Sequence, residues 1–223
     1  MIKVIITGST GMVGEGVLHE CLKHPSISEV LVINRKPCKV AHHKLNEIIL
    51  PDFLNPDSIS SVVPGYDACY FCLGVTSLGK KEPEYHTLTY DLTIKFAKVL
   101  VRQNPEMTFC YISGLGTDNS EKGKIMWARV KGKTENALMM LPFKKVVVFR
   151  PGLIIPTPGL KNTLSVYKWF RFLIPALKKI FPKSFSTLGD IGLAMIGTQS
   201  LDSNRLVLET KDINTLAHTS HVS

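Results

Sequence analysis

The stretch TGSTGMVG, residues 7–14, follows the apolar run Ile2–Thr7 and leads into a segment with helical spacing, Val13–Lys23. Its glycines have the spacing GxxGxxG. Between a strand and a helix, such glycines permit a tight turn, close approach of the main chain to a pyrophosphate, and close packing of helix on strand. The N-terminus of the helix then offers N–H groups and a positive dipole end to phosphates. The stretch predicts a dinucleotide-binding turn, with an ordinary strand-to-helix turn as the alternative.

Short apolar runs recur after this turn and alternate with longer segments of helical spacing. Alternation of this kind predicts an α/β fold in which helices cover both faces of a parallel sheet. Several of the runs are almost continuously apolar, as strands buried on both faces should be. We expect a single doubly wound domain over residues 1–223. The predicted strands and helices after the turn are Val30–Asn34, Lys44–Leu50, Ala68–Leu73, Met107–Ser113, Lys145–Arg150 and Leu206–Glu209, with helices in Glu84–Arg102 and Lys124–Leu141.

The composition is that of an ordinary globular protein, with 44% hydrophobic and 20% charged residues among 223. No uncharged apolar run approaches the roughly 18 residues that span a bilayer, so we expect no transmembrane segment. The N-terminal residues lack the layout of a signal peptide, which predicts a cytoplasmic protein. The net charge of +9 invites an anionic partner, but no nucleic-acid-binding signature accompanies it, so we expect no nucleic acid.

The five cysteines are scattered through apolar stretches, and their odd number favours reduced thiols. Cys69 and Cys72 have the spacing of a redox or zinc pair. On a strand, however, positions three apart face opposite sides of the sheet. The dipeptide His42-His43 also lacks the spacing of metal ligands. We therefore expect packing roles and no metal site.

The end of the second predicted strand reads Asn34-Arg35-Lys36. An NAD-binding domain usually carries an acidic residue near this point, where it holds the ribose 2′-hydroxyl. Here two cations stand where a 2′-phosphate would lie, and Arg35 could pair with it bidentately. The motif favours NADP(H) over NAD(H), with a solvated basic pair as the alternative.

Taken in order, these motifs resemble those of the extended and atypical short-chain dehydrogenase/reductase superfamily, whose members include NAD-dependent epimerases and dehydratases. Within it, the chain is most similar to the small NADPH-binding members related to the Tat-interacting protein. The resemblance spans nearly the whole chain and implies a Rossmann fold. The motifs that carry it are TGSTGMVG at 7–14, NRK at 34–36, Asp52-Phe53, CLGVT at 72–76, Ser113, VKGKTE at 130–135 and FRPG at 149–152.

The resemblance implies a role for each matching residue. Asp52 and Phe53 would border the adenine, and Lys131 would hold the nicotinamide ribose. Ser113 would donate a hydrogen bond to a substrate oxygen, although a serine at a strand end is often only a cap. The residues implied in cofactor binding are Gly8, Ser9, Thr10, Gly11, Met12, Val13, Gly14, Asn34, Arg35, Lys36, Asp52, Phe53, Leu73, Gly74, Lys131, Pro151 and Gly152.

The sequence departs from the family at one position. The usual proton donor is a tyrosine four residues before the lysine, and here Trp127 takes that place. The indole nitrogen donates a hydrogen bond but does not ionise in a useful range. Ser113 and Lys131 are the catalytic residues that remain, and Tyr85 or Tyr90 is a possible substitute donor. The sequence does not supply a complete catalytic set.

Prolines, aromatic residues and cations crowd the segment after Gly152. We expect residues 153–187 to form a small C-terminal lid on the substrate side, since ligands lie at the carboxyl ends of the strands in this architecture. Residues 161–183 would give it a basic rim. An apolar or anionic small molecule, a membrane surface or a protein partner would suit it. A packed helix with its lysines in water is an equal alternative.

Two functions stay open on the sequence. The first is an NADP-dependent oxidoreductase or epimerase-like enzyme with an altered catalytic set. The second is a non-catalytic NADPH-sensing protein that acts through a protein partner. Both need the cofactor site. The loss of the tyrosine favours the second, but the resemblance leads us to prefer the first, with weak or altered chemistry. A homodimer is compatible with either.

Overall fold

The structure of the chain, a computed structural model, describes residues 1–157, 159–162 and 184–219. Its main sheet has seven strands, all paired in parallel, in the order β3-β2-β1-β4-β5-β6-β9. This is the strand order of a Rossmann fold with one more strand at the end, and it confirms the predicted doubly wound α/β class. The strands are β1 Ile2–Thr7, β2 Ile27–Asn34, β3 Leu45–Ile49, β4 Ala68–Phe71, β5 Thr108–Ile112, β6 Lys145–Arg150 and β9 Arg205–Glu209.

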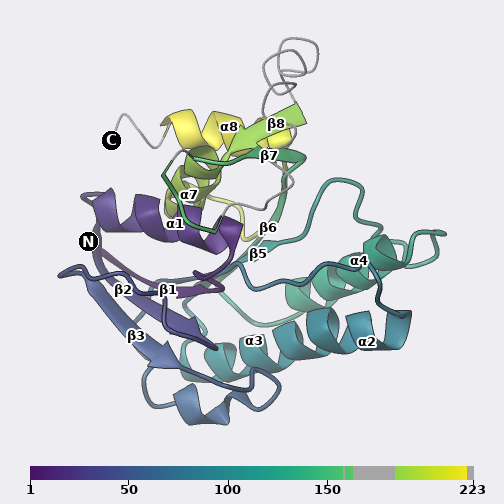
Figure 1. Cartoon of the computed structure of the whole chain (residues 1–223), viewed down its shortest axis with the longest axis horizontal. Coiled ribbons are helices and arrows are strands. Elements are labelled where there is room, and N and C mark those ends of the chain that lie inside the picture. The colour runs from purple at the N-terminus through teal and green to yellow at the C-terminus, as the bar shows by residue number, and fades with distance from the viewer. Residues whose placement is uncertain (158, 163–183, 220–223) are drawn as a thin grey trace.

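Helices cover both faces of the sheet (Figure 1). One layer holds α1 Met12–Lys23, α7 Leu188–Gly197 and α8 Thr210–Thr219. The opposite layer holds α2 Glu82–His86, α3 Leu92–Gln103 and α4 Met126–Met139. Short turns of helix also occur at Pro56–Ile59 and Thr198–Ser200. The helices therefore cover both faces of the sheet, and a ligand can approach it only at the ends of the strands.

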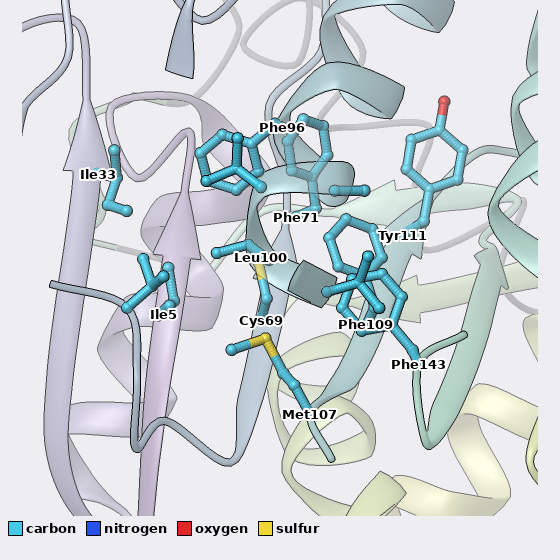
Figure 2. Packing of buried hydrophobic residues seen from close by; sticks show 14 of the residues in the cluster. Ile5, Ile33, Cys69, Phe71, Phe96, Leu100, Met107, Phe109, Tyr111 and Phe143 are labelled. Carbon is cyan, nitrogen blue, oxygen red and sulfur yellow. The ribbon is translucent and has the colours of Figure 1, made fainter. Parts of the chain in front are cut away.

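Each face of the sheet packs its own apolar cluster. Figure 2 shows the cluster beneath α3, where Phe71 lies against Phe96 and Phe109 with ring centroids 5.5 and 5.8 Å apart. Cys69 belongs to this cluster, whereas Cys72 packs against the cluster on the other face. The prediction that these two thiols face opposite sides of the sheet is confirmed. Within the described residues, no three His, Cys, Asp or Glu side chains gather as a metal site.

The region between β6 and β9 holds structure that the sequence pattern did not predict. Helix α7 is buried along nearly its whole length, so its sequence has no polar face and no helical period. It begins at Thr187, whose hydroxyl accepts from Asp190 N–H while the Asp190 carboxylate accepts from Thr187 N–H. Two short strands, β7 Leu153–Ile155 and β8 Phe185–Thr187, pair in parallel as a separate small sheet.

The predicted lid is only partly described. Its first residues form β7 and the following turn, and its last residues form β8. Most of the basic, aromatic segment that was expected to cover the cleft, residues 163–183, lies outside the described residues. Across the described part of the chain, no helix is long and apolar enough to cross a membrane.

Candidate functional site

The glycine-rich turn is built by close contacts between main-chain atoms. Gly8 has a φ of +71°, and a Cβ there would lie 2.8 Å from Leu73 N. A Cβ on Gly14 would lie 2.2 Å from Gly8 O, which no side chain could tolerate. Helix α1 then begins after Gly11, which provides no side-chain cap. The N–H groups of the first helical turn are therefore left for a ligand, and this geometry fits the pyrophosphate of a dinucleotide.

Asn34, at the end of β2, fixes the turn from the side. Its Oδ1 accepts from Ser9 N–H at 3.2 Å, and its Nδ2 donates to Ser9 Oγ at 2.8 Å. Both residues are buried. Asn34 therefore holds the turn in place, a contact that the motif alone did not indicate.

Glu47 of β3 is a site residue that the sequence reasoning missed. Its Oε1 accepts from Asn34 Nδ2 at 3.1 Å and from Cys38 N–H at 2.8 Å. The carboxylate thus ties the end of β2 to the loop that follows it. That loop presents Arg35 and Lys36, both exposed, to the solvent beside the turn. Glu47 could be identified only from the register of β2 and β3, in which it pairs with Val32, two residues before Asn34.

The residues expected near the adenine take up different positions. Asp52 is exposed, and bonds from Leu54 N–H and the Asn55 side chain hold the pKa of its carboxyl below the usual value. Phe53 is only 1% exposed and its ring stacks on Phe96 with a centroid distance of 5.4 Å. A contact of Phe53 with a ligand would have to come from its main chain. Leu73 and Gly74 lie in the loop after β4, separated from it by Cys72, and Leu73 N–H donates to Thr7 Oγ1 at 3.3 Å.

The carboxyl ends of β5 and β6 border a cleft of 560 Å³. Ser113 and Leu115 come from the end of β5, and the stretch Pro151–Ile154 comes from the end of β6. Leu115 N–H donates to Pro151 O at 3.0 Å, which joins the two sides. Gly152 is required here because a Cβ would lie 2.6 Å from Ser184 O. Ser113, Pro151 and Gly152, predicted from separate motifs, are thus brought together.

The hydroxyl of Ser113 is already engaged, because its Oγ donates to Phe149 O at 3.2 Å. It can accept a hydrogen bond from a ligand without rearrangement, but donation to a substrate oxygen requires this bond to break. Besides Ser113, the cleft-lining residues that the structure describes include one further hydroxyl, that of Ser184.

Trp127 and Lys131 lie on one face of α4, and both are half-buried. The Lys131 ammonium donates to Ser113 O at 2.5 Å and lies 3.5 Å from Ile112 O. Burial lowers the pKa of Lys131 to about 8, and the Glu135 carboxylate offsets part of this effect. The lysine therefore points at the end of β5, beside the cleft.

A buried charge network supports this end of the site. Arg150, at the end of β6, donates from Nε to Glu135 Oε1 at 3.0 Å and from Nη2 to Glu135 Oε2 at 2.5 Å. The Glu135 side chain is 1% exposed and that of Arg150 is 14% exposed. Asn119 bonds to both residues, so the loop before α4 is fixed as well. No sequence motif identified this network.

The substitute proton donors lie elsewhere. Tyr85 is buried, and its pKa is raised by burial. The Tyr90 ring is tilted against that of His86 with centroids 4.7 Å apart, and the Lys133 ammonium lies 5.0 Å from the centre of the Tyr90 ring. Neither tyrosine is among the residues that line the cleft.

Comparison with known proteins agrees with this geometry. Residues 4–117, from β1 through the loop after β5, match the model of the NAD dependent epimerase/dehydratase family. The chain belongs to this family. Its members bind NAD(P), and the uncapped helix and the glycine-rich turn are the parts that fit such a cofactor.

Two curated relatives extend the comparison beyond the family model. Mitochondrial protein fmp52 of Emericella nidulans is 30% identical over 161 residues, covering 69% of this chain and 67% of the relative. Protein HTATIP2 of Rattus norvegicus is 28% identical over 155 residues, covering 68% of this chain and 62% of the relative. The expected similarity to Tat-interacting-protein-like members is therefore confirmed. The chain spans about two thirds of the length of these relatives.

Among solved structures, MoeE5 in complex with UDP-glucuronic acid and NAD superposes with a TM-score of 0.69 at 15% identity. The match covers 93% of this chain and 76% of MoeE5. At this identity the likeness establishes the fold and leaves the substrate of this chain open.

The prediction of a cytoplasmic protein was wrong. Several relatives that match the chain are described as mitochondrial, including those of Emericella nidulans, Aspergillus oryzae and Neurospora crassa. The prediction rested only on the lack of a recognisable signal peptide. Such a pattern reports on secretion and carries no information about other compartments.

Proposed function

We propose that this protein binds NADP(H) in preference to NAD(H) and has oxidoreductase or epimerase-like chemistry that is weak or altered. The observation that carries the proposal is Trp127 in the place of the family's tyrosine, four residues before Lys131. The Lys131 ammonium contacts Ser113 O at a cleft whose described lining offers only serine hydroxyls as proton donors. The tryptophan removes the usual general acid, while the glycine-rich turn that binds the cofactor is intact.

Each part of the site then has a definite task. The first turn of α1 binds the pyrophosphate, and Asn34 and Glu47 hold that turn and the loop after β2 in place. Arg35 and Lys36 neutralise the 2′-phosphate. When bound, NADPH supplies a hydride. Lys131 holds the nicotinamide ribose, and its lowered pKa lets it release a proton near pH 8 more readily than an ordinary lysine.

A second candidate is a cofactor-responsive binding protein that acts through a protein partner. The same observation favours it, because cofactor binding needs no general acid and catalysis usually does. General acid help typically contributes about 10²–10⁴-fold in rate. The two candidates differ in turnover, not in NADPH affinity.

The deciding experiment compares NADPH consumption by the wild type, Trp127→Tyr and Trp127→Phe across aldehydes, ketones and quinones. We expect slow or undetectable turnover by the wild type and Trp127→Phe, and at least about tenfold faster carbonyl reduction by Trp127→Tyr. NADPH affinity, measured by calorimetry, should be nearly equal in all three proteins. The phenylalanine variant separates the hydroxyl from the change in shape.

Rapid turnover by the wild type would refute the altered-chemistry proposal, since it would require a proton donor other than Trp127. No turnover by any of the three proteins, together with tight NADPH binding, would favour the cofactor-responsive binding protein. Equal affinities for NADPH and NADH would refute the cofactor preference independently of either result.

A further inference from the structure

The cleft at the carboxyl ends of β5 and β6 has an unusual lining for a chain with a net charge of +9. Its side chains are mainly apolar, and of the described residues that border it none is charged. The apolar part is Val13, Ile112, Leu115, Pro151, Leu153 and Ile154. Ser113 and Ser184 supply the only side-chain hydroxyls in that lining. The cleft therefore offers burial to an apolar molecule and hydrogen bonding to one or two polar atoms.

Two leucines at this cleft are exposed, and neither belongs to the apolar clusters of the core. Leu115 is 55% exposed and Leu153 is 54% exposed. The bond from Leu115 N–H to Pro151 O holds the two segments side by side. Exposed large apolar side chains that gather at a concave site, rather than singly, mark a surface that a ligand covers. Covering both leucines removes apolar area from water and favours binding.

A nucleotide sugar makes different demands. Its diphosphate carries charge that, once buried, needs cations or several N–H donors. Cations are present near the other end of the site, at Arg35 and Lys36. Beside this cleft, the Lys131 ammonium is already bonded to Ser113 O, and none of the described residues that line the cleft is a cation. The lining thus selects against the class of ligand that MoeE5 holds in its complex with UDP-glucuronic acid.

We propose that this cleft binds a neutral, apolar carbonyl compound, such as a medium-chain ketone, and not a nucleotide sugar. The carbonyl oxygen accepts from the Ser184 hydroxyl, or from Ser113 once its bond to Phe149 O breaks, and the alkyl part covers Leu115 and Leu153. The assignment rests on the proposed function, because it places this ligand beside the nicotinamide end of the cofactor.

The test is binding of 2-nonanone and of UDP-glucuronic acid to the full chain, by saturation-transfer NMR and calorimetry. Both ligands are titrated with and without NADP⁺, whose oxidised ring cannot reduce the ketone. The variants are Leu115→Asp and Leu153→Asn, which introduce a charge and a neutral polar group. Met140→Asp is the matched control, since Met140 is 85% exposed at the end of α4 and does not line the cleft.

We expect 2-nonanone to bind the wild type and Met140→Asp equally, and Leu115→Asp about tenfold more weakly. Leu153→Asn should also weaken binding. If one of the two variants fails to fold, the other still tests the proposal. Absence of 2-nonanone binding, tighter binding of UDP-glucuronic acid, or equal affinities in all variants would overturn the proposal. A separate calorimetric titration measures NADPH binding alone. Absence of NADPH binding would contradict the proposed function, whereas the ligand of the cleft is tested by the 2-nonanone titration.

Discussion

The two ends of the site follow different rules. At the dinucleotide end, main-chain contacts leave no freedom, and a Cβ on Gly14 would meet Gly8 O at 2.2 Å. At the proposed nicotinamide end, the Glu135–Arg150 pair gives the framework buried support, and Trp127 stands where the resemblance places the reacting side chain. On this proposal, the site keeps the structure that binds a cofactor and lacks the group that moves a proton.

Cofactor binding and proton transfer therefore depend on different physical features of the protein. Cofactor binding depends on the geometry of the backbone. Contacts from many residues maintain this geometry, and one side chain that does not fit disrupts it. Proton transfer depends on one ionisable group at one point. Variants of the framework should therefore affect stability and affinity strongly, whereas variants of individual charged side chains should have smaller and more selective effects.

The strongest test of the contrast is Gly14→Ala. The added methyl group cannot avoid Gly8 O without moving α1 or the turn, so we expect more than about 3 kcal/mol of destabilisation and loss of NADPH binding. This corresponds to a fall in melting temperature of roughly 6–12 °C for a chain of this size. Gly189→Ala is the control, since a Cβ at Gly189 would lie no closer than 3.6 Å to any neighbouring atom and the residue has no proposed contact with the cofactor. A stable, NADPH-binding Gly14→Ala protein would contradict the geometry of the turn.

The next largest effect should come from Glu135→Gln. The amide keeps one acceptor but leaves the Arg150 guanidinium without its buried counter-charge, which we expect to cost about 2–3 kcal/mol. Urea unfolding of both proteins measures it. Glu84→Gln serves as the control, because the Glu84 side chain is 53% exposed and its pair with Lys80 should contribute less than about 0.5 kcal/mol. Equal losses in the two variants would show that burial of the Glu135 pair is irrelevant.

Arg35→Ala tests the dinucleotide end through a side chain. We expect about tenfold weaker binding of NADPH, or ~1.4 kcal/mol, with little change for NADH, because only NADPH carries the 2′-phosphate. Calorimetric titration with both cofactors measures the preference. Lys98→Ala removes the same charge from the exposed side of α3 and should leave both affinities unchanged. An unchanged NADPH preference in Arg35→Ala would rule out the assigned role of this arginine.

The features of the fold that could be predicted from the sequence are those with a clear local pattern of apolar residues. The limits of β1 and β6 were predicted to the residue, because each is a short apolar run between clear boundaries. The predicted helix Glu84–Arg102 exists, but a π-helical turn at Thr87–Asp91 interrupts it. That turn depends on packing against α4 and has no signature in the pattern.

Residues that act through distant neighbours could not be found in the same way. Glu47 reaches Asn34 only because β2 and β3 pair in one particular register, and Glu135 reaches Arg150 across 15 residues. The motif placed Phe53 near the adenine, but its side chain points into the core. A motif gives the position of a residue along the chain, whereas the direction of its side chain is set by tertiary packing.

Lys131 should give the most selective effect, a dependence of stability on pH. The pKa of Lys131 is lowered to about 8 in the folded protein, whereas an unfolded lysine has a pKa near 10.5. Between these values the unfolded chain binds a proton that the folded chain does not, so this residue makes the free energy of unfolding rise with pH. Lys131→Met lacks that contribution. Wild type should therefore be the less stable of the two at pH 7, and the difference should shrink towards pH 10. Urea unfolding of both proteins at pH 7, 8, 9 and 10 measures it, with Lys133→Met, whose lysine lies over the Tyr90 ring, as the control. A constant difference between wild type and Lys131→Met across this range would show that the ammonium is not desolvated, and the nicotinamide end would then be as open to water as the loop that carries Arg35.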